Sequence, residues 1–126
     1  MIVIDTDVLI EILDKKSEKG DEALKCITES GEDICTTAIN LHEILYGLHK
    51  YGKPVKEILL LPVLGFTKKD ASLSSKIELE AERKGKATRR TDAMIAAIAI
   101  NNGASLYTFD RKHFSPLKAS GLKLFP

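Results

Sequence analysis

The stretch Met1-Ile2-Val3-Ile4-Asp5 is a short apolar run that ends in a carboxylate, and Leu106-Tyr107-Thr108-Phe109-Asp110 repeats this arrangement near the other end of the sequence. Short, continuous apolar runs are typical of strands that are buried on both faces of a parallel sheet. Asp5 and Asp110 therefore come at the carboxyl ends of two predicted strands. In an open parallel sheet, ligands bind beyond that edge.

Predicted strands and helices alternate along the rest of the sequence. This order favours an α/β fold with a central, mostly parallel, five-stranded sheet flanked by helices. We expect strands over residues 2–5, 33–36, 63–66, 105–109 and 122–124, and helices over residues 7–15, 21–29, 38–49, 55–61, 71–84 and 91–102. Thr67 and Asp70 have the spacing of a capping box, and Gly85 and Gly103 are expected to end two helices in the left-handed conformation. The 126 residues suit one domain, spanning 1–126.

The composition is that of a globular protein without an overall charge bias, because 19 basic residues balance 18 acidic ones. Net charge therefore does not indicate a nucleic-acid-binding protein. Basic residues do cluster locally before Asp92, at Arg83, Lys84, Lys86, Arg89 and Arg90. This cluster suits either a contact to phosphate groups or a solvated charged turn, which is the commoner meaning of such a run.

Cys26 and Cys35 form no CxxC pair and have no matching histidine spacing. Neither a zinc site nor a disulfide framework is indicated, and we expect both side chains to be buried. No apolar stretch approaches the ~20 residues that a membrane span requires, and the first apolar run is too short for a signal peptide. We therefore expect no association with a membrane, and we expect the protein to be in the cytoplasm.

Two further acidic residues lie in predicted helices. Glu43 lies beside the apolar face of an amphipathic helix, and Asp92 opens the almost wholly apolar segment 93–100. Gly47, on the same stripe as Glu43, weakens a helix by ~1 kcal/mol and so indicates a close approach to the backbone. Each acidic residue has an ordinary explanation by itself: Asp5, Asp92 and Asp110 suit helix starts, and Glu43 suits a solvated surface.

One shared site explains the positions of all four acidic residues better than four separate structural roles do. Carboxylates that lie close together repel one another unless they are protonated, paired with cations or bound to metal. A ligand set made only of oxygen atoms, without cysteine or histidine, favours Mg²⁺ or Mn²⁺ over zinc. The sequence therefore predicts a divalent-metal site built from Asp5, Glu43, Asp92 and Asp110.

Four segments together resemble the ordered motifs of PIN-domain ribonucleases, above all the small VapC-type toxins of toxin–antitoxin pairs. They are Val3-Ile4-Asp5-Thr6-Asp7-Val8-Leu9-Ile10, Leu41-His42-Glu43-Ile44-Leu45-Tyr46-Gly47, Thr91-Asp92-Ala93-Met94-Ile95-Ala96-Ala97 and Leu106-Tyr107-Thr108-Phe109-Asp110-Arg111-Lys112-His113-Phe114. The resemblance covers essentially the whole sequence and implies a single PIN-like domain.

The resemblance also implies roles for individual residues. The catalytic metal ligands would be Asp5, Glu43, Asp92 and Asp110, supported by Thr6, Asp7 and Thr108, and the substrate contacts would include Lys86, Arg89, Arg90 and Arg111. Asp7 stands where many relatives carry Asn or Ser, which suggests a supporting role. Phe109 departs from the family, because relatives often carry a polar residue there. The implied activity is Mg²⁺- or Mn²⁺-dependent hydrolysis of RNA, with a cognate antitoxin as partner and a homodimer as the usual assembly.

Two alternatives follow from the same residues. Ile4-Asp5-Thr6-Asp7 also resembles the start of haloacid-dehalogenase-like phosphatases, although that family would place Thr or Val at Leu9 and requires a lysine and a hydroxyl motif that the sequence does not show. The other alternative is a PIN-like module that binds RNA or protein without catalysis. The four intact carboxylates argue against this second alternative.

Overall fold

The structure, a computed structural model, describes residues 1–126 and contains one five-stranded sheet. The strands are β1 (Ile2–Ile4), β2 (Ile34–Thr37), β3 (Val63–Leu64), β4 (Ser105–Tyr107) and β5 (Lys123–Phe125). Their order in the sheet is β3-β2-β1-β4-β5, and every neighbouring pair is parallel. The predicted α/β class is confirmed, and the mostly parallel sheet is in fact wholly parallel.

Seven α-helices, one π-helical turn and one 3₁₀-helical segment connect and cover the strands. The helices are α1 (Thr6–Leu9), α2 (Glu18–Ser30), α3 (Ala38–Lys50), α4 (Lys56–Leu59), α5 (Lys68–Arg83), α6 (Arg90–Asn101) and α7 (Arg111–Phe114), and the turns are the π-turn η1 (Ile10–Asp14) and the 3₁₀ turn η2 (Ser115–Ser120). The predicted helices other than the first are present with shifted ends. Thr67 and Asp70 form the predicted capping box, and Gly85 and Gly103 have the predicted positive φ angles of 70° and 62°.

The first predicted helix is wrong in its second half. After α1 the chain widens into η1, where the Lys15 N–H donates to the Ile10 carbonyl at 2.8 Å. Gly20 of α2 packs directly against this turn, because a Cβ at Gly20 would lie 2.1 Å from the Glu11 carbonyl oxygen. Only a residue without a side chain allows the backbones to approach so closely.

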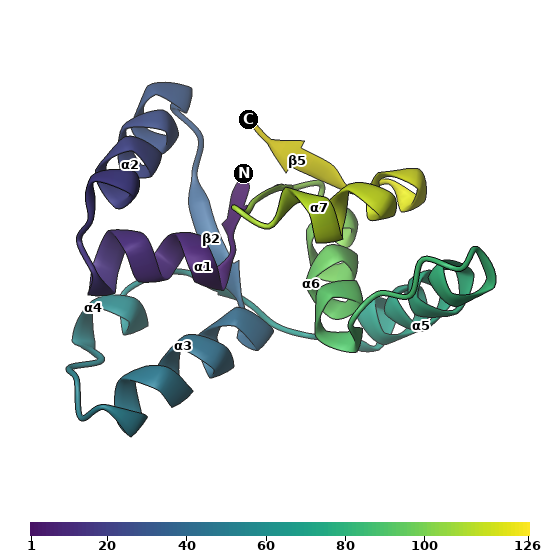
Figure 1. The fold of residues 1–126 in the computed structure, drawn as a ribbon, viewed down its shortest axis with the longest axis horizontal. Helices are drawn as coiled ribbons and strands as arrows, with labels where there is room; N and C mark the ends of the chain where they lie inside the picture. Colours follow the sequence, from purple (N-terminus) through teal and green to yellow (C-terminus); the bar gives the residue numbers. More distant parts are fainter.

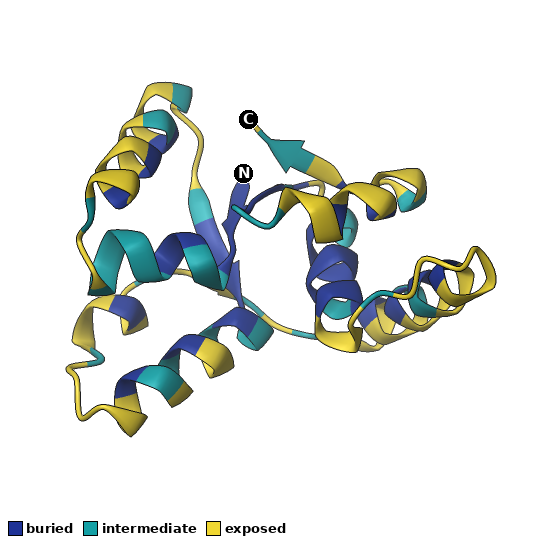
Figure 2. Cartoon of the chain, viewed as in Figure 1, coloured by how far each residue is buried: buried dark blue, intermediate teal, exposed yellow.

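Two apolar cores lie on the two faces of the sheet, and β1 contributes to both. Val3 faces the core formed with α5, α6 and η2, while Ile2 and Ile4 face the core formed with α1, α2, α3 and α4. Figure 1 shows α5 and α6 on one side of the strands and α1 and α2 on the other. In Figure 2, β1 and most of α6 are buried. Helices on both faces explain why β1 is a continuous apolar run and not an alternating one.

Three other expectations have mixed outcomes. Cys35 is buried as predicted, but Cys26 is only half-buried, and both are free thiols. The expected close approach at Gly47 is wrong within this chain, because a Cβ there would meet no other atom within 4 Å. None of the helices has the length and apolar character needed to span a membrane.

Candidate functional site

One pocket of about 250 Å³ lies beyond the carboxyl edge of the sheet and gathers the four predicted acidic residues. Asp5 follows β1, Glu43 projects from α3, which follows β2, Asp92 lies in the first turn of α6, and Asp110 follows β4. The strand order changes direction between β1 and β4, so the crevice opens at the switch point of the sheet. In Figure 1 the first turns of α1, α3 and α6 face this central region. Asp7 and Arg89 also line the pocket.

Asp5 is the most firmly held of these carboxylates. Its Oδ1 accepts hydrogen bonds from the Thr6 N–H at 2.9 Å and from the Asn40 amide at 2.8 Å, and its Oδ2 accepts from the Thr108 hydroxyl at 2.7 Å. The side chain caps α1 as well as facing the pocket, so the two interpretations of Asp5 are compatible. These donors fix the direction of a carboxylate that is only 8% exposed.

Asn40 links α3 to β1, and its role was not predicted from the sequence. Its amide nitrogen donates to Asp5 and, at 3.0 Å, to the Thr6 hydroxyl, while its Oδ1 accepts from Thr37. The Thr6 hydroxyl in turn donates to Glu43 at 3.2 Å. The spacing of Asn40 three residues before Glu43 on one helical stripe was the available signal. Asn40 therefore connects two of the acidic residues through a fully buried amide.

Asp7 lies beside the end of β4. Its Oδ2 accepts from the Phe109 N–H at 3.2 Å, whereas its Oδ1 is buried and has no hydrogen-bond partner. The Asp110 N–H donates to the Thr108 hydroxyl at 3.0 Å. Side chains thus take the backbone donors that would otherwise extend the strand, which explains why β4 ends at Tyr107 and not at the predicted Phe109.

Arg89 joins the other two acidic residues. Its Nε donates to Asp92 Oδ2 at 2.9 Å, and its Nη2 donates to Asp110 Oδ2 at 3.0 Å. The second oxygen of Asp110 lies 2.6 Å from His113 Nδ1. Asp92 and Asp110 therefore share one guanidinium, and Asp110 has a polar partner on each oxygen.

The electrostatic environment divides the carboxylates into two groups. Burial raises the pKa of Asp5 from 3.8 to about 6, and burial likewise raises the pKa values of Asp7 and Glu43. The hydrogen bond with His113 lowers the pKa of Asp110, and Arg89 adds to this effect. Ion pairs neutralise Asp92 and Asp110, but no ion pair in the chain neutralises Asp5, Asp7 or Glu43. This side of the pocket therefore favours a bound cation.

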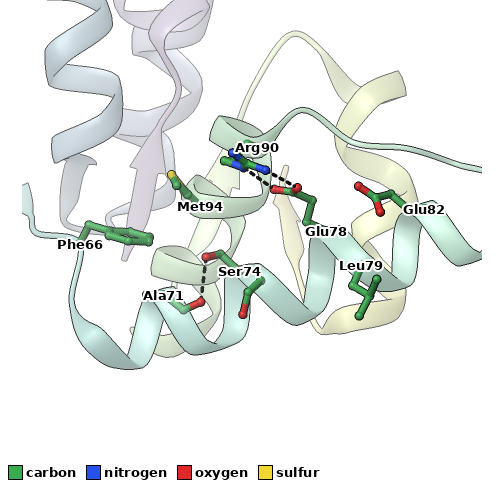
Figure 3. A pocket seen from close by; sticks show the side chains of 9 residues that line it. Phe66, Ala71, Ser74, Glu78, Leu79, Glu82, Arg90 and Met94 are labelled. Atoms are coloured by element: carbon green, nitrogen blue, oxygen red, sulfur yellow. Dashed lines mark hydrogen bonds and ion pairs between the residues drawn. The ribbon is translucent and has the colours of Figure 1, made fainter.

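The other predicted substrate contacts lie away from this pocket. Arg90 forms two hydrogen bonds with Glu78 of α5, at 3.0 and 3.1 Å, and lines a separate pocket of about 370 Å³ beside Met94 and Phe66 (Figure 3). Lys86 follows the end of α5 and lies near η2, and Arg111 donates to the Phe125 carbonyl at 3.4 Å. Of the four predicted basic residues, only Arg89 lines the acidic pocket.

The residue types fit a divalent cation bound through oxygen atoms. The pocket offers five carboxylates and no cysteine or histidine, and one buried carboxylate oxygen, Asp7 Oδ1, has no partner. In their present positions, however, no three acidic, histidine or cysteine side chains are close enough to hold one ion. Two of the carboxylates, Asp92 and Asp110, are engaged by Arg89.

Known proteins resemble this chain over almost its whole length. The PIN domain family matches residues 2–118. Ribonuclease VapC1 of Methanocaldococcus jannaschii is 29% identical, with 98% of this chain and 86% of that protein covered. Ribonuclease VapC2 of Haemophilus influenzae is 24% identical, with 89% of this chain and 88% of that protein covered.

Solved structures give the same result for the fold. A crystal structure of VapBC2 from Rickettsia felis, bound to a DNA fragment from its promoter, matches with a TM-score of 0.82 and 26% identity over 99% of this chain and 98% of the other. VapBC-5 of Mycobacterium tuberculosis, described as a member of the VapBC family of toxin–antitoxin systems, has a TM-score of 0.72 and 20% identity over 98% and 95% of the two chains. The family match excludes the haloacid-dehalogenase-like alternative. Its extent, together with the shared fold, shows that this chain belongs to the PIN-domain family.

Proposed function

We propose that the protein is an endoribonuclease that depends on Mg²⁺ or Mn²⁺ and acts as the toxin of a VapBC-type toxin–antitoxin pair. The observation that carries this proposal is the convergence of Asp5, Glu43, Asp92 and Asp110 on one pocket of a PIN domain. Relatives that match most of the chain are ribonucleases by name, which supports RNA as the substrate. The four carboxylates are assigned as the metal ligands.

The protein's contribution to hydrolysis is to position charge. A divalent ion bound at such a site lowers the pKa of a water molecule and stabilises the charge that develops on a phosphodiester. Asn40 and Thr108 hold Asp5 in a fixed direction, and Thr6 directs Glu43. This arrangement reduces the reorganisation that the site needs during the reaction.

Substrate phosphates require basic groups at the rim of the pocket. Arg89 is the basic side chain that lines it, and its position before α6 suits a contact to a phosphate next to the scissile bond. Lys86, Arg90 and Arg111 would contact RNA only farther from the acidic pocket, because each has its present neighbours elsewhere. Such contacts make the affinity for RNA fall with increasing salt concentration.

The partner that best suits this function is a cognate antitoxin. Similar folds occur in VapBC complexes, in which a toxin chain is paired with an antitoxin. We also propose a homodimer, and action on RNA in the cytoplasm. Light scattering of the purified protein tests the dimer, and co-purification with the product of an adjacent small reading frame tests the antitoxin.

Cleavage of a structured RNA tests the enzymatic proposal. The parent protein is expected to cleave with Mg²⁺ or Mn²⁺, to lose activity in EDTA, and to regain it when either ion is restored. Asp92→Asn should lower the cleavage rate by ~100-fold or more, because a site with one ligand fewer holds the ion poorly. Cleavage that survives both EDTA and Asp92→Asn would refute metal-dependent hydrolysis at this pocket.

The same experiment separates catalysis from binding alone. If the protein were a non-catalytic PIN-like module, the parent, Asp5→Asn and Asp92→Asn proteins would all bind RNA or a protein partner equally well. None of the three would show metal-dependent cleavage. Glu78→Gln serves as the control substitution, since Glu78 lies in the separate pocket beside Arg90. It should cleave like the parent protein.

A further inference from the structure

We propose that Arg89 occupies the place of a cation in the metal-free protein and must withdraw from Asp92 and Asp110 before a divalent ion binds. This inference rests on the proposed function. In this role Arg89 competes with the divalent ion for the carboxylates, which is different from a contact with the substrate.

The contacts compete with metal binding at the same atoms. Arg89 donates to Oδ2 of Asp92 and to Oδ2 of Asp110, at 2.9 and 3.0 Å. An ion bound to either oxygen would lie close to the Arg89 guanidinium, and the two positive charges would repel each other. The guanidinium spans the two carboxylates, one at the start of α6 and one after β4, so it bridges two separate elements.

Arg89 is held in place by little else. Its side chain is 62% exposed, and its side-chain hydrogen bonds are those with Asp92 and Asp110. The pair with Asp110 is exposed and contributes little, whereas Asp92 is only 9% exposed, so withdrawal from Asp92 is favourable when an ion takes the place of the guanidinium. The side chain can therefore leave the pocket without a change in the fold.

Withdrawal couples metal binding to RNA binding. Once Arg89 has left the carboxylates, its N–H donors are free at the rim of the pocket and suit the oxygens of a phosphate group. RNA that engages Arg89 likewise frees Asp92 and Asp110 to bind metal. Because such coupling is reciprocal, RNA and the divalent ion should each strengthen the binding of the other.

Arg90 provides a matched control. It is the next residue, carries the same charge, and lies in a bidentate pair with Glu78 on the side of α6 that faces α5 (Figure 3). It does not line the acidic pocket. Loss of positive charge at Arg90 therefore tests whether a general change in charge explains any effect seen at Arg89.

The experiment measures Mn²⁺ binding to metal-stripped protein by isothermal titration calorimetry, without RNA. Arg89→Gln should bind Mn²⁺ more tightly than the parent by on the order of tenfold, because the ion no longer has to displace the two ion pairs that Arg89 makes in the parent. Arg90→Gln should stay within about twofold of the parent, because its ion pair is elsewhere. Arg89→Lys should fall between these, since lysine keeps the charge but lacks the planar fork that spans both carboxylates.

Thermal unfolding supplies a second measurement. Metal-free Arg89→Gln should unfold at a lower temperature than the parent, because the carboxylates lose their counter-ion, and it should gain more from added Mn²⁺. The inference would be overturned if Arg89→Gln bound Mn²⁺ no more tightly than the parent, or if Arg90→Gln gained as much affinity as Arg89→Gln. Either result would leave the nuclease proposal intact. Absence of Mn²⁺ binding in all four proteins would overturn both.

Discussion

Asp5 carries a buried charge that should weaken the metal-free protein, and Asp5→Asn tests this directly. The carboxylate is 8% exposed, and burial raises its pKa from 3.8 to about 6. Asparagine keeps the shape of the side chain without the charge. Its oxygen can accept from Thr6 and Asn40 as Asp5 does, and its amide can donate to the Thr108 hydroxyl.

The sign of the effect follows from the pKa values. Because the folded pKa of Asp5 exceeds the unfolded value, the folded state holds more protons between pH 3.8 and about 6, and stability falls as the pH rises through this range. At about 1.4 kcal/mol per pH unit, the full cost above pH 6 is about 3 kcal/mol. Asp5→Asn avoids this cost, so the variant should be more stable than the parent at pH 7 by up to ~3 kcal/mol.

Urea unfolding of the metal-free protein, followed by circular dichroism at several pH values, measures the effect. The stabilisation by Asp5→Asn should be largest at pH 7 and should disappear near pH 4, where the parent carboxyl is protonated. Asp33→Asn is the control, because Asp33 is an exposed carboxylate without a side-chain hydrogen bond, and its effect should be small throughout.

Added Mn²⁺ sharpens the same test. The ion should stabilise the parent more than Asp5→Asn, so the difference between the two proteins should shrink or reverse. The reasoning would be refuted if Asp5→Asn were less stable than the parent at pH 7 without metal, or if its effect were the same at pH 4 and pH 7. The first result would mean that hydrogen bonds to the charged form outweigh its burial, and the second would mean that they balance it.

Two predictions concern packing and polar contacts. Gly20→Ala should destabilise the fold by ~1–3 kcal/mol, because the new methyl group would overlap the Glu11 carbonyl. Gly47→Ala, whose Cβ meets no atom within 4 Å, should instead stabilise it by ~0.5–1 kcal/mol, and equal effects in urea unfolding would contradict this contrast. Asn40→Ala should cost ~1–3 kcal/mol and slow RNA cleavage, since Thr37 and Asp5 lose a buried partner. A variant with parental stability would show that the Asn40 amide is not needed to support the site.

The strands and helices were predictable because their signals are local. The apolar run 2–4 indicates a strand buried on both faces, and the spacing of Thr67 and Asp70 indicates the start of α5. The π-turn η1 was not predictable, because it accompanies the contact between Glu11 and Gly20, which lie in different elements. Strand ends were also missed where side chains from elsewhere bind the backbone, as Asp7 does at Phe109.

The sequence by itself determined the set of acidic residues and the edge of the sheet at which they lie, because a residue's place at a strand end or helix start follows from its neighbours along the chain. The tertiary structure alone decided how these carboxylates are paired. Asn40 supports Asp5, Thr6 supports Glu43, and Arg89, but not Arg90, enters the acidic pocket. The physical reason is that hydrogen bonds and ion pairs depend on distances of about 3 Å between side chains from different elements, and packing of the whole fold sets those distances.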